Sequence, residues 1–136
     1  MLTIEEFKVY KQQLAAIIAS FSQKIANLSS EEKLAFQKAS IAKYVKVEEE
    51  LFSYDLSSIP FNLYEGISLL APDDKVLDLS KSKANIDFKM VEVYGNVNFK
   101  GCNLKNITSS KGKVSPDYLD EEVVRTHKDY FLSKKI

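Results

Sequence analysis

The sequence predicts one α+β domain, residues 1–136, in which an N-terminal antiparallel helical hairpin packs on a few short strands and a C-terminal helix follows. Three observations predict this class. Residues 2–54 carry two capped stretches with apolar residues every three or four positions, residues 59–108 change to short strand-like runs between turns, and residues 115–133 return to a helical pattern. A chain of 136 residues is long enough to bury one such core.

Two capping boxes mark the starts of the hairpin helices. Thr3 with Glu6, and Ser29 with Glu32, have the spacing at which each side chain satisfies the other residue's free backbone N–H. The apolar stripes that follow are Phe7, Tyr10, Leu14, Ile17, Phe21, Ile25 and Leu28 on the first helix, and Leu34, Ile41, Tyr44, Val45, Leu51 and Phe52 on the second. Because the turn between the helices is short, they must run antiparallel, with their stripes able to face each other.

The middle region, residues 59–108, has the pattern of short strands. Phe61–Tyr64 after Pro60 predicts one helical turn ending near Gly66, and Pro72-Asp-Asp74 predicts a chain reversal. Strands are expected at Lys75–Leu79, Ile86–Val93 and Val97–Phe99. Since strands this short are not stable alone, we expect the amphipathic helices to cover them. Phe21, Leu34, Ile41 and Phe88 are then expected to be nearly fully buried.

The last region, residues 115–133, predicts one final helix. Pro116 suits its first position if Ser115 is the cap, and the acidic residues near its start complement the helix dipole. Its expected buried face is Leu119, Val123, Tyr130 and Phe131. Apolar surface left over on the hairpin is then covered either by this helix folding back or by another protein chain.

A five-residue pattern runs through Val97-Asn-Phe-Lys-Gly, Cys102-Asn-Leu-Lys-Asn and Ile107-Thr-Ser, and Ala84-Asn-Ile-Asp-Phe88 fits the same template. This stretch resembles the pentapeptide-repeat proteins. The resemblance implies a square coil with two inward columns, here Val97, Cys102 and Ile107, and Phe99 with Leu104. Ala84 is out of register with Val97, because their separation is not a multiple of five. We therefore expect either one or two coil turns or an ordinary pair of strands.

The composition argues against several classes of function. Lys+Arg and Asp+Glu are equal at 19 each and Arg125 is the one Arg, so the chain lacks the basic surface of a nucleic-acid binder. It equally lacks the acidic surface with which some pentapeptide-repeat proteins mimic nucleic acid. No apolar run approaches the roughly 18 residues of a membrane span. One Cys excludes an internal disulfide framework and, with the acidic start at residues 1–6, favours a cytoplasmic location.

No set of residues predicts catalysis, and neither a cofactor nor a metal is expected. Cys102 and His127 are the one possible thiol–imidazole pair, but the repeat pattern turns Cys102 inward as a packing residue. The carboxylates at 73–78 and 117–121 lack the ligand spacing of a calcium loop, and no Gly-x-Gly-x-x-Gly phosphate loop occurs.

We interpret the chain as a non-enzymatic protein–protein interaction module or adaptor, either standalone or the N-terminal domain of a larger bacterial protein or effector. The first helix has apolar residues beyond the stripe that one neighbour needs, because Ile18 adjoins Ile17. The candidate interface is Ile18, Phe7, Tyr10 and Leu14, which would bind a protein partner or a second copy in a homodimer. Nucleic acid and membrane are not the expected partners. The alternatives are a small enzyme whose site the spacing does not reveal, and a weak nucleic-acid binder.

Overall fold

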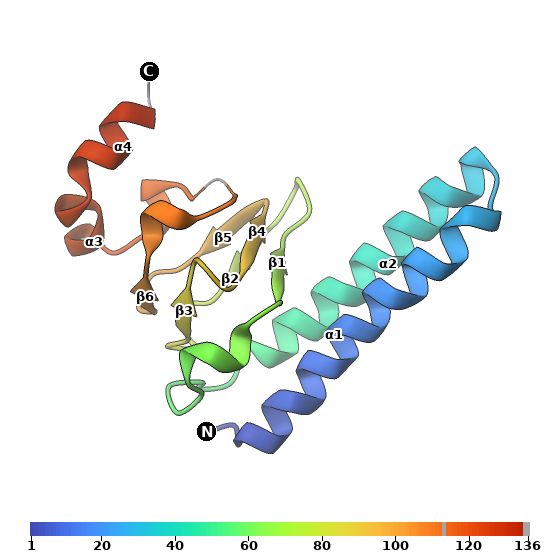
Figure 1. Cartoon of the computed structure of the whole chain (residues 1–136), viewed down its shortest axis with the longest axis horizontal. Helices are drawn as coiled ribbons and strands as arrows, with labels where there is room; N and C mark the ends of the chain where they lie inside the picture. The colour runs from blue at the N-terminus through green and yellow to red at the C-terminus, as the bar shows by residue number, and fades with distance from the viewer. Residues whose placement is uncertain (113, 135–136) are drawn as a thin grey trace.

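A computed structural model describes residues 1–112 and 114–134 of the chain. A long antiparallel helical hairpin, α1 (Ile4–Lys24) and α2 (Ser30–Leu51), packs on a small coil of short parallel strands (Figure 1). Two short C-terminal helices lie on the other side of that coil. The predicted α+β class, with a helical hairpin on short strands, is therefore confirmed.

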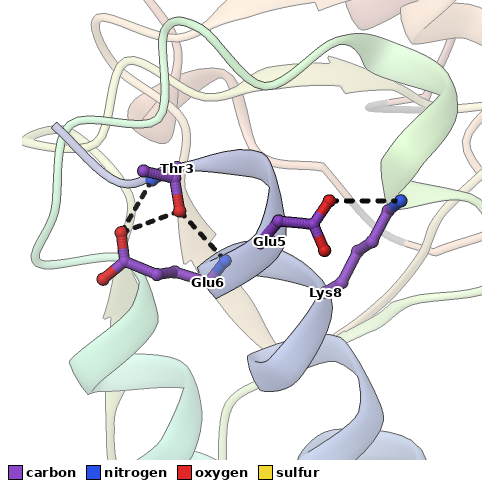
Figure 2. A network of polar contacts seen from close by, with 4 residues as sticks. All are labelled: Thr3, Glu5, Glu6 and Lys8. Carbon is purple, nitrogen blue, oxygen red and sulfur yellow. Dashed lines mark hydrogen bonds and ion pairs between the residues drawn. The ribbon is translucent and has the colours of Figure 1, made fainter.

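Both capping boxes start their helices as predicted. At α1, the Glu6 backbone N–H donates to the Thr3 hydroxyl at 3.1 Å, and the Thr3 backbone N–H donates to the Glu6 carboxylate at 3.1 Å (Figure 2). Ser29 and Glu32 make the same reciprocal pair at the start of α2. A single 3-10 turn, Ile25–Asn27, connects the helices. This short connection holds them side by side and antiparallel.

The middle of the chain winds twice around a common core. The first turn holds β1 (Ser68–Leu70), β2 (Val76–Asp78) and β3 (Asn85–Asp87), and the second holds β4 (Glu92–Tyr94), β5 (Asn96–Asn98) and β6 (Asn103–Lys105). Each strand pairs in parallel with its counterpart one turn later, β1 with β4, β2 with β5 and β3 with β6. Of the two expected arrangements, the chain adopts the coil, because consecutive strands do not pair with each other.

The break in the five-residue register lies between Ala84 and Val97, the stretch that contains β3 and β4, and the spacing of stacked partners also differs from side to side of the coil. Stacked partners on the β2–β5 side are 20 residues apart, but on the β3–β6 side they are 18 apart. Partners on the β1–β4 side are 24 apart, so the first turn is longer than the second, in part through the bend at Ser82 and Lys83 between β2 and β3. Lys83 has a left-handed backbone with φ 53°, and the buried Ser82 hydroxyl donates to the Leu79 carbonyl at 2.6 Å.

The inward columns of the coil follow the five-residue pattern. Val97, Phe99, Cys102 and Ile107 are buried, as are Ala84, Ile86 and Phe88 of the first turn. Leu104 of β6, in the second turn, remains partly exposed. The Asn/Asp position of the pattern stacks between turns: Asn98 donates to Asp78 at 3.3 Å, and Asn103 donates to Asn85 at 3.0 Å. The pattern thus predicts side-chain orientation correctly even where its register breaks.

Two strand expectations need correction. The prediction of one continuous strand over Ile86–Val93 is wrong, because the chain turns between β3 and β4. The Lys89 backbone N–H donates to the Asp87 carboxylate at 3.0 Å, which is the local hydrogen bond that favours a turn over a continuing strand. Strand β1 was not predicted, because Ser68–Leu70 is too short to show an alternating pattern.

The predicted C-terminal helix is present, but not as one helix over residues 115–133. Its place is taken by a 3-10 turn at Pro116–Tyr118, capped by Ser115, and by α3 (Glu121–Thr126) and α4 (Lys128–Lys134). The Tyr118 carbonyl accepts the Phe99 backbone N–H at 2.8 Å, and the buried Leu119 is extended. Pairing with the coil therefore delays the helix, which breaks again at His127, whose backbone is not helical.

Candidate interaction surface

The coil covers only one half of the hairpin. In that half Phe7, Leu14 and Leu51 are fully buried, and the Tyr44 hydroxyl donates to the Ser68 carbonyl at 2.5 Å. The other half, residues 15–43, projects beyond the coil, and none of its side chains is fully buried (Figure 1). We call residues 15–43 the distal hairpin.

The apolar stripe that the coil covers continues along the distal hairpin. Side chains seven residues apart lie on one helix face, and two such series run along the hairpin: Phe7, Leu14 and Phe21 on α1, and Leu34, Ile41 and Glu48 on α2. Phe7, Leu14 and Glu48 are buried at the coil end. Farther out, Leu34 is 55% exposed, and Ile18 is 46% exposed. The sequence therefore specifies an apolar face longer than the coil that it meets.

This arrangement corrects the expected core. Phe88 is buried as predicted, but Phe21 and Ile41 are only half-buried and Leu34 is exposed. The reason is that each distal helix has one neighbour, the other helix. Phe21 stacks on Phe36 with ring centroids 5.8 Å apart, and its other surroundings are the open hollow that it lines with Leu70 and Tyr94.

A concave surface lies where the distal hairpin leaves the coil. A hollow of about 480 Å³ has the apolar lining residues Ile17, Ile18, Phe21, Ile41, Leu70 and Tyr94. A second hollow of about 900 Å³ shares Ile41, Leu70 and Tyr94 with the first and extends to the loop at residues 71–75. We call the two together the hairpin–coil groove. Its lining comes from α1, α2, β1 and β4, so segments distant in sequence build it.

The rim of the hairpin–coil groove carries charges of both signs. Lys38 and Lys46 stand on α2, and Asp73 and Asp74 stand on the facing loop. The ion pair formed among the described residues lies elsewhere, on the exposed first turns of α1, where the Lys8 ammonium is 4.0 Å from the Glu5 carboxylate (Figure 2). The rim charges are thus not engaged with each other, and they are free to meet charges on a partner.

Of the four residues predicted for the interface, the structure leaves Ile18 on the surface. Phe7 and Leu14 are covered by the rest of the chain, and Tyr10 is half-buried with its hydroxyl donating to Glu50 at 2.8 Å. Leu70 and Tyr94 belong to the groove but were missed, because helix periodicity cannot show which strand lies beside a helix.

Glu48 on α2 is a buried carboxyl group that contacts the groove residue Leu70. One of its oxygens accepts the Leu70 backbone N–H at 2.9 Å, and the other has no hydrogen-bond partner among the described residues. Burial raises the pKa of Glu48 to about 9, against the lowering effect of the Leu70 N–H, and the nearby Glu49 carboxylate adds to the rise. At neutral pH Glu48 is therefore protonated, and it joins α2 to β1 without carrying a charge.

The thiol–imidazole pair is placed near one hollow but is not arranged for nucleophilic chemistry. Cys102 and His127 both line a hollow of about 440 Å³ beside α3. The Cys102 sulfur is buried 3.4 Å from the Leu79 carbonyl, and burial raises the pKa of this thiol to about 11. His127 Nδ1 lies 2.9 Å from the Val123 carbonyl, which can only accept, so Nδ1 carries the proton. Cys102 is a packing residue in this arrangement.

Two further features are absent from the described part of the chain. Residues 1–112 and 114–134 contain no group of three or more His, Cys, Asp or Glu side chains placed to hold a metal ion. Over the same residues, no helix combines the length and apolar character that crossing a membrane requires.

Comparison with known proteins adds no relative. No protein family, curated protein or solved structure matches the chain. The hairpin–coil groove and the distal hairpin are therefore interpreted from their own geometry.

Proposed function

We propose that this chain is a non-enzymatic protein–protein interaction module, acting as a standalone adaptor or as the N-terminal domain of a larger bacterial protein or effector. The observation that carries the proposal is the distal hairpin: its apolar stripe continues past the coil, and a groove with free rim charges lies where the hairpin leaves the coil. Exposed contiguous apolar surface rimmed by polar residues is typical of binding sites.

The coil serves as the rigid base of this module. Its stacked Asn and Asp side chains and filled inward columns support the proposal that it is a short pentapeptide-like coil. A two-turn coil has too few turns to form a long repeat surface of its own. The hairpin therefore provides the binding surface. A single buried thiol supports the proposal that the module works in a reducing cytoplasm.

The competing explanation for the apolar hairpin face, coverage by the C-terminal region, has no support in the fold. Val123, Tyr130 and Phe131 belong to α3 and α4, which lie across the coil from the distal hairpin (Figure 1). Phe131 is buried there, and Val123 and Tyr130 pack against the coil core.

The test compares Ile18→Lys with Val9→Lys. Val9 is a suitable control because it is 53% exposed on α1, similar to Ile18, but lies on the opposite side of the helix, about 180° away at 100° per residue. We expect both variants to keep the melting temperature within about 4 °C of wild type, as surface substitutions do. Association, measured by light scattering of the pure chain and by recovery of a stoichiometric partner, should be lost only with Ile18→Lys. Unfolding of Ile18→Lys would show that this face is core and would overturn the proposal, as would equal loss of association in both variants.

A further inference from the structure

We propose that the outer edge of β6 binds an extended basic segment of a partner protein, which adds to the coil as a further strand in the hollow between β6 and α3. This surface is separate from the distal hairpin, because α3 lies across the coil from that hairpin (Figure 1). Three observations carry the inference: outward-facing backbone groups on β6, an apolar column that ends half-buried, and an acidic lining.

The hydrogen bonds of β6 show which of its backbone groups face outward. The Asn103 N–H donates to the Ala84 carbonyl at 2.9 Å, toward β3. The Lys105 carbonyl accepts the Phe88 N–H at 3.0 Å, also from the β3 side. Because alternate residues of a strand direct their backbone groups to opposite sides, the N–H and C=O of Leu104 point away from β3. No strand among the described residues pairs with β6 on that side.

The chain after β6 covers the other two sides of the second turn and leaves the β6 side open. Gly112 packs so closely on β4 that an added Cβ would lie 1.9 Å from the Val93 carbonyl oxygen. Next to β5, the Phe99 N–H donates to the Tyr118 carbonyl at 2.8 Å. Between β6 and α3, in contrast, the described residues enclose a hollow of about 440 Å³. An extended segment placed there would continue the stack of strands on this side.

The side chain of Leu104 indicates what such a segment must carry. Its register partner one turn earlier, Ile86, is fully buried. Leu104 packs on the same core but is only half-buried, and it lines the hollow. An added strand that places an apolar residue over Leu104 would bury it as β6 buries Ile86. Backbone pairing combined with contacts of alternate side chains is the usual mode of strand addition.

The charges of the hollow favour a basic segment. Its lining contains the carboxylates of Asp120 and Glu122 and, among the described residues, no Lys or Arg. The Gly101 N–H donates to the Asp120 carboxylate at 3.0 Å and fixes its position, whereas Glu122 is exposed. The Lys105 ammonium of β6 lies 4.3 Å from the centre of the Phe61 ring, a residue that does not line the hollow. Lysine or arginine side chains on either side of the apolar residue would therefore meet acidic groups of opposite charge.

Peptide binding to the wild-type chain tests the proposal. The probe is a peptide of about eight residues, a usual strand length, in which lysine and valine alternate. The matched peptide alternates glutamate and valine. Because Leu104 offers one N–H and one C=O, we expect weak binding of the lysine peptide, with a Kd between about 100 µM and about 1 mM.

Hydrogen exchange locates the bound peptide. The Leu104 amide should exchange at least about tenfold more slowly when the lysine peptide is near saturation, because its N–H becomes hydrogen-bonded. The Asn103 amide is the internal control, since it is already bonded to β3 and should change less. Both amides are followed by NMR of the same sample.

Two variants test the charge contact. Glu122→Lys puts a positive charge in the hollow, whereas Glu121→Lys makes the same change on the neighbouring exposed residue of α3, which does not line the hollow. In about 150 mM salt, which screens distant charges, Glu122→Lys should raise the Kd of the lysine peptide at least about threefold more than Glu121→Lys does. Equal effects of the two variants would overturn the assigned contact.

The remaining outcomes also decide the matter. Absence of binding at about 2 mM lysine peptide would overturn the proposal. Binding that leaves exchange of the Leu104 amide unchanged would place the peptide elsewhere and overturn it, and equal binding of the glutamate peptide would overturn the basic partner. Each result is distinguishable from failure of the proposed function, because Ile18→Lys changes the distal hairpin alone and should bind the lysine peptide as the wild-type chain does.

Discussion

Replacing the buried acid at the base of the hairpin should stabilise this protein at neutral pH. The substitution Glu48→Gln keeps the shape of the side chain and an oxygen that can accept the Leu70 N–H. In the wild-type chain the Leu70 nitrogen lies 2.9 Å from the Glu48 carboxyl oxygen. It removes the ionisable group. Glu48 is fully buried, so the folded chain holds its proton up to a pKa of about 9, whereas the unfolded chain releases it near the ordinary value of 4.5.

The sign and size of the effect follow from that difference. Because the folded chain binds a proton that the unfolded chain has released, wild-type stability is greatest below about pH 4.5 and falls as the pH rises toward about 9. At pH 7, which is 2.5 units above the unfolded pKa of 4.5, keeping Glu48 protonated lowers the free energy of unfolding by up to about 3 kcal/mol, at about 1.36 kcal/mol per pH unit. Gln has no proton to take up on folding. Glu48→Gln should therefore be about 3 kcal/mol more stable than wild type at pH 7 and no more stable at pH 4.

Urea unfolding followed by circular dichroism at pH 4, 7 and 8.5 measures the effect. Glu49→Gln is the matched control, because Glu49 is the neighbouring residue, is exposed and should leave most of the pH dependence in place. The reasoning is refuted if Glu48→Gln is less stable than wild type at pH 7, or if its stability falls with pH as steeply as that of Glu49→Gln.

Three further predictions concern packing. Leu14→Ala should cost about 2–5 kcal/mol in urea unfolding because Leu14 is buried against the coil, whereas Leu34→Ala should change the free energy of unfolding of the monomer by less than about 0.5 kcal/mol. Gly95→Ala should cost more than about 1 kcal/mol, because Gly95 has φ +88° and an added Cβ would lie 2.2 Å from the Ala71 carbonyl oxygen; a melting temperature equal to wild type would contradict this. The Cys102 thiol should react with a thiol reagent at pH 8 only in urea, and fast labelling of the native chain would show that it is accessible.

Local signals in the sequence predicted the starts of the two long helices and most of the inward-facing residues of the coil. The capping boxes at Thr3 and Ser29 fixed both helix starts, because cap and helix are built from residues three apart. The five-residue pattern predicted that Val97, Phe99 and Cys102 face inward, because orientation within a short repeat is also a local property. The helix starts and the inward columns are therefore the parts of the fold that short-range chemistry determines.

Long-range placement could not be predicted in the same way. Leu34 and Leu14 have the same periodicity, yet one is exposed and the other buried, because the coil ends between them. The C-terminal helix is delayed to Glu121 by the bond from Phe99 to Tyr118, a contact between segments that the pattern of either one does not show. The groove at Leu70 was missed for the same reason, since it exists only where α2 passes β1.

The central claim is that the apolar face of the distal hairpin, residues 15–43, is a binding surface and not part of the core of one chain. Amide hydrogen exchange of Ile18→Lys and Val9→Lys, each compared with the wild-type chain, tests this claim directly. We expect the coil strands to keep wild-type protection in both variants, because their core lies within one chain and does not include Ile18. Loss of coil-strand protection in Ile18→Lys alone would contradict the claim, because it would show that this face belongs to the core.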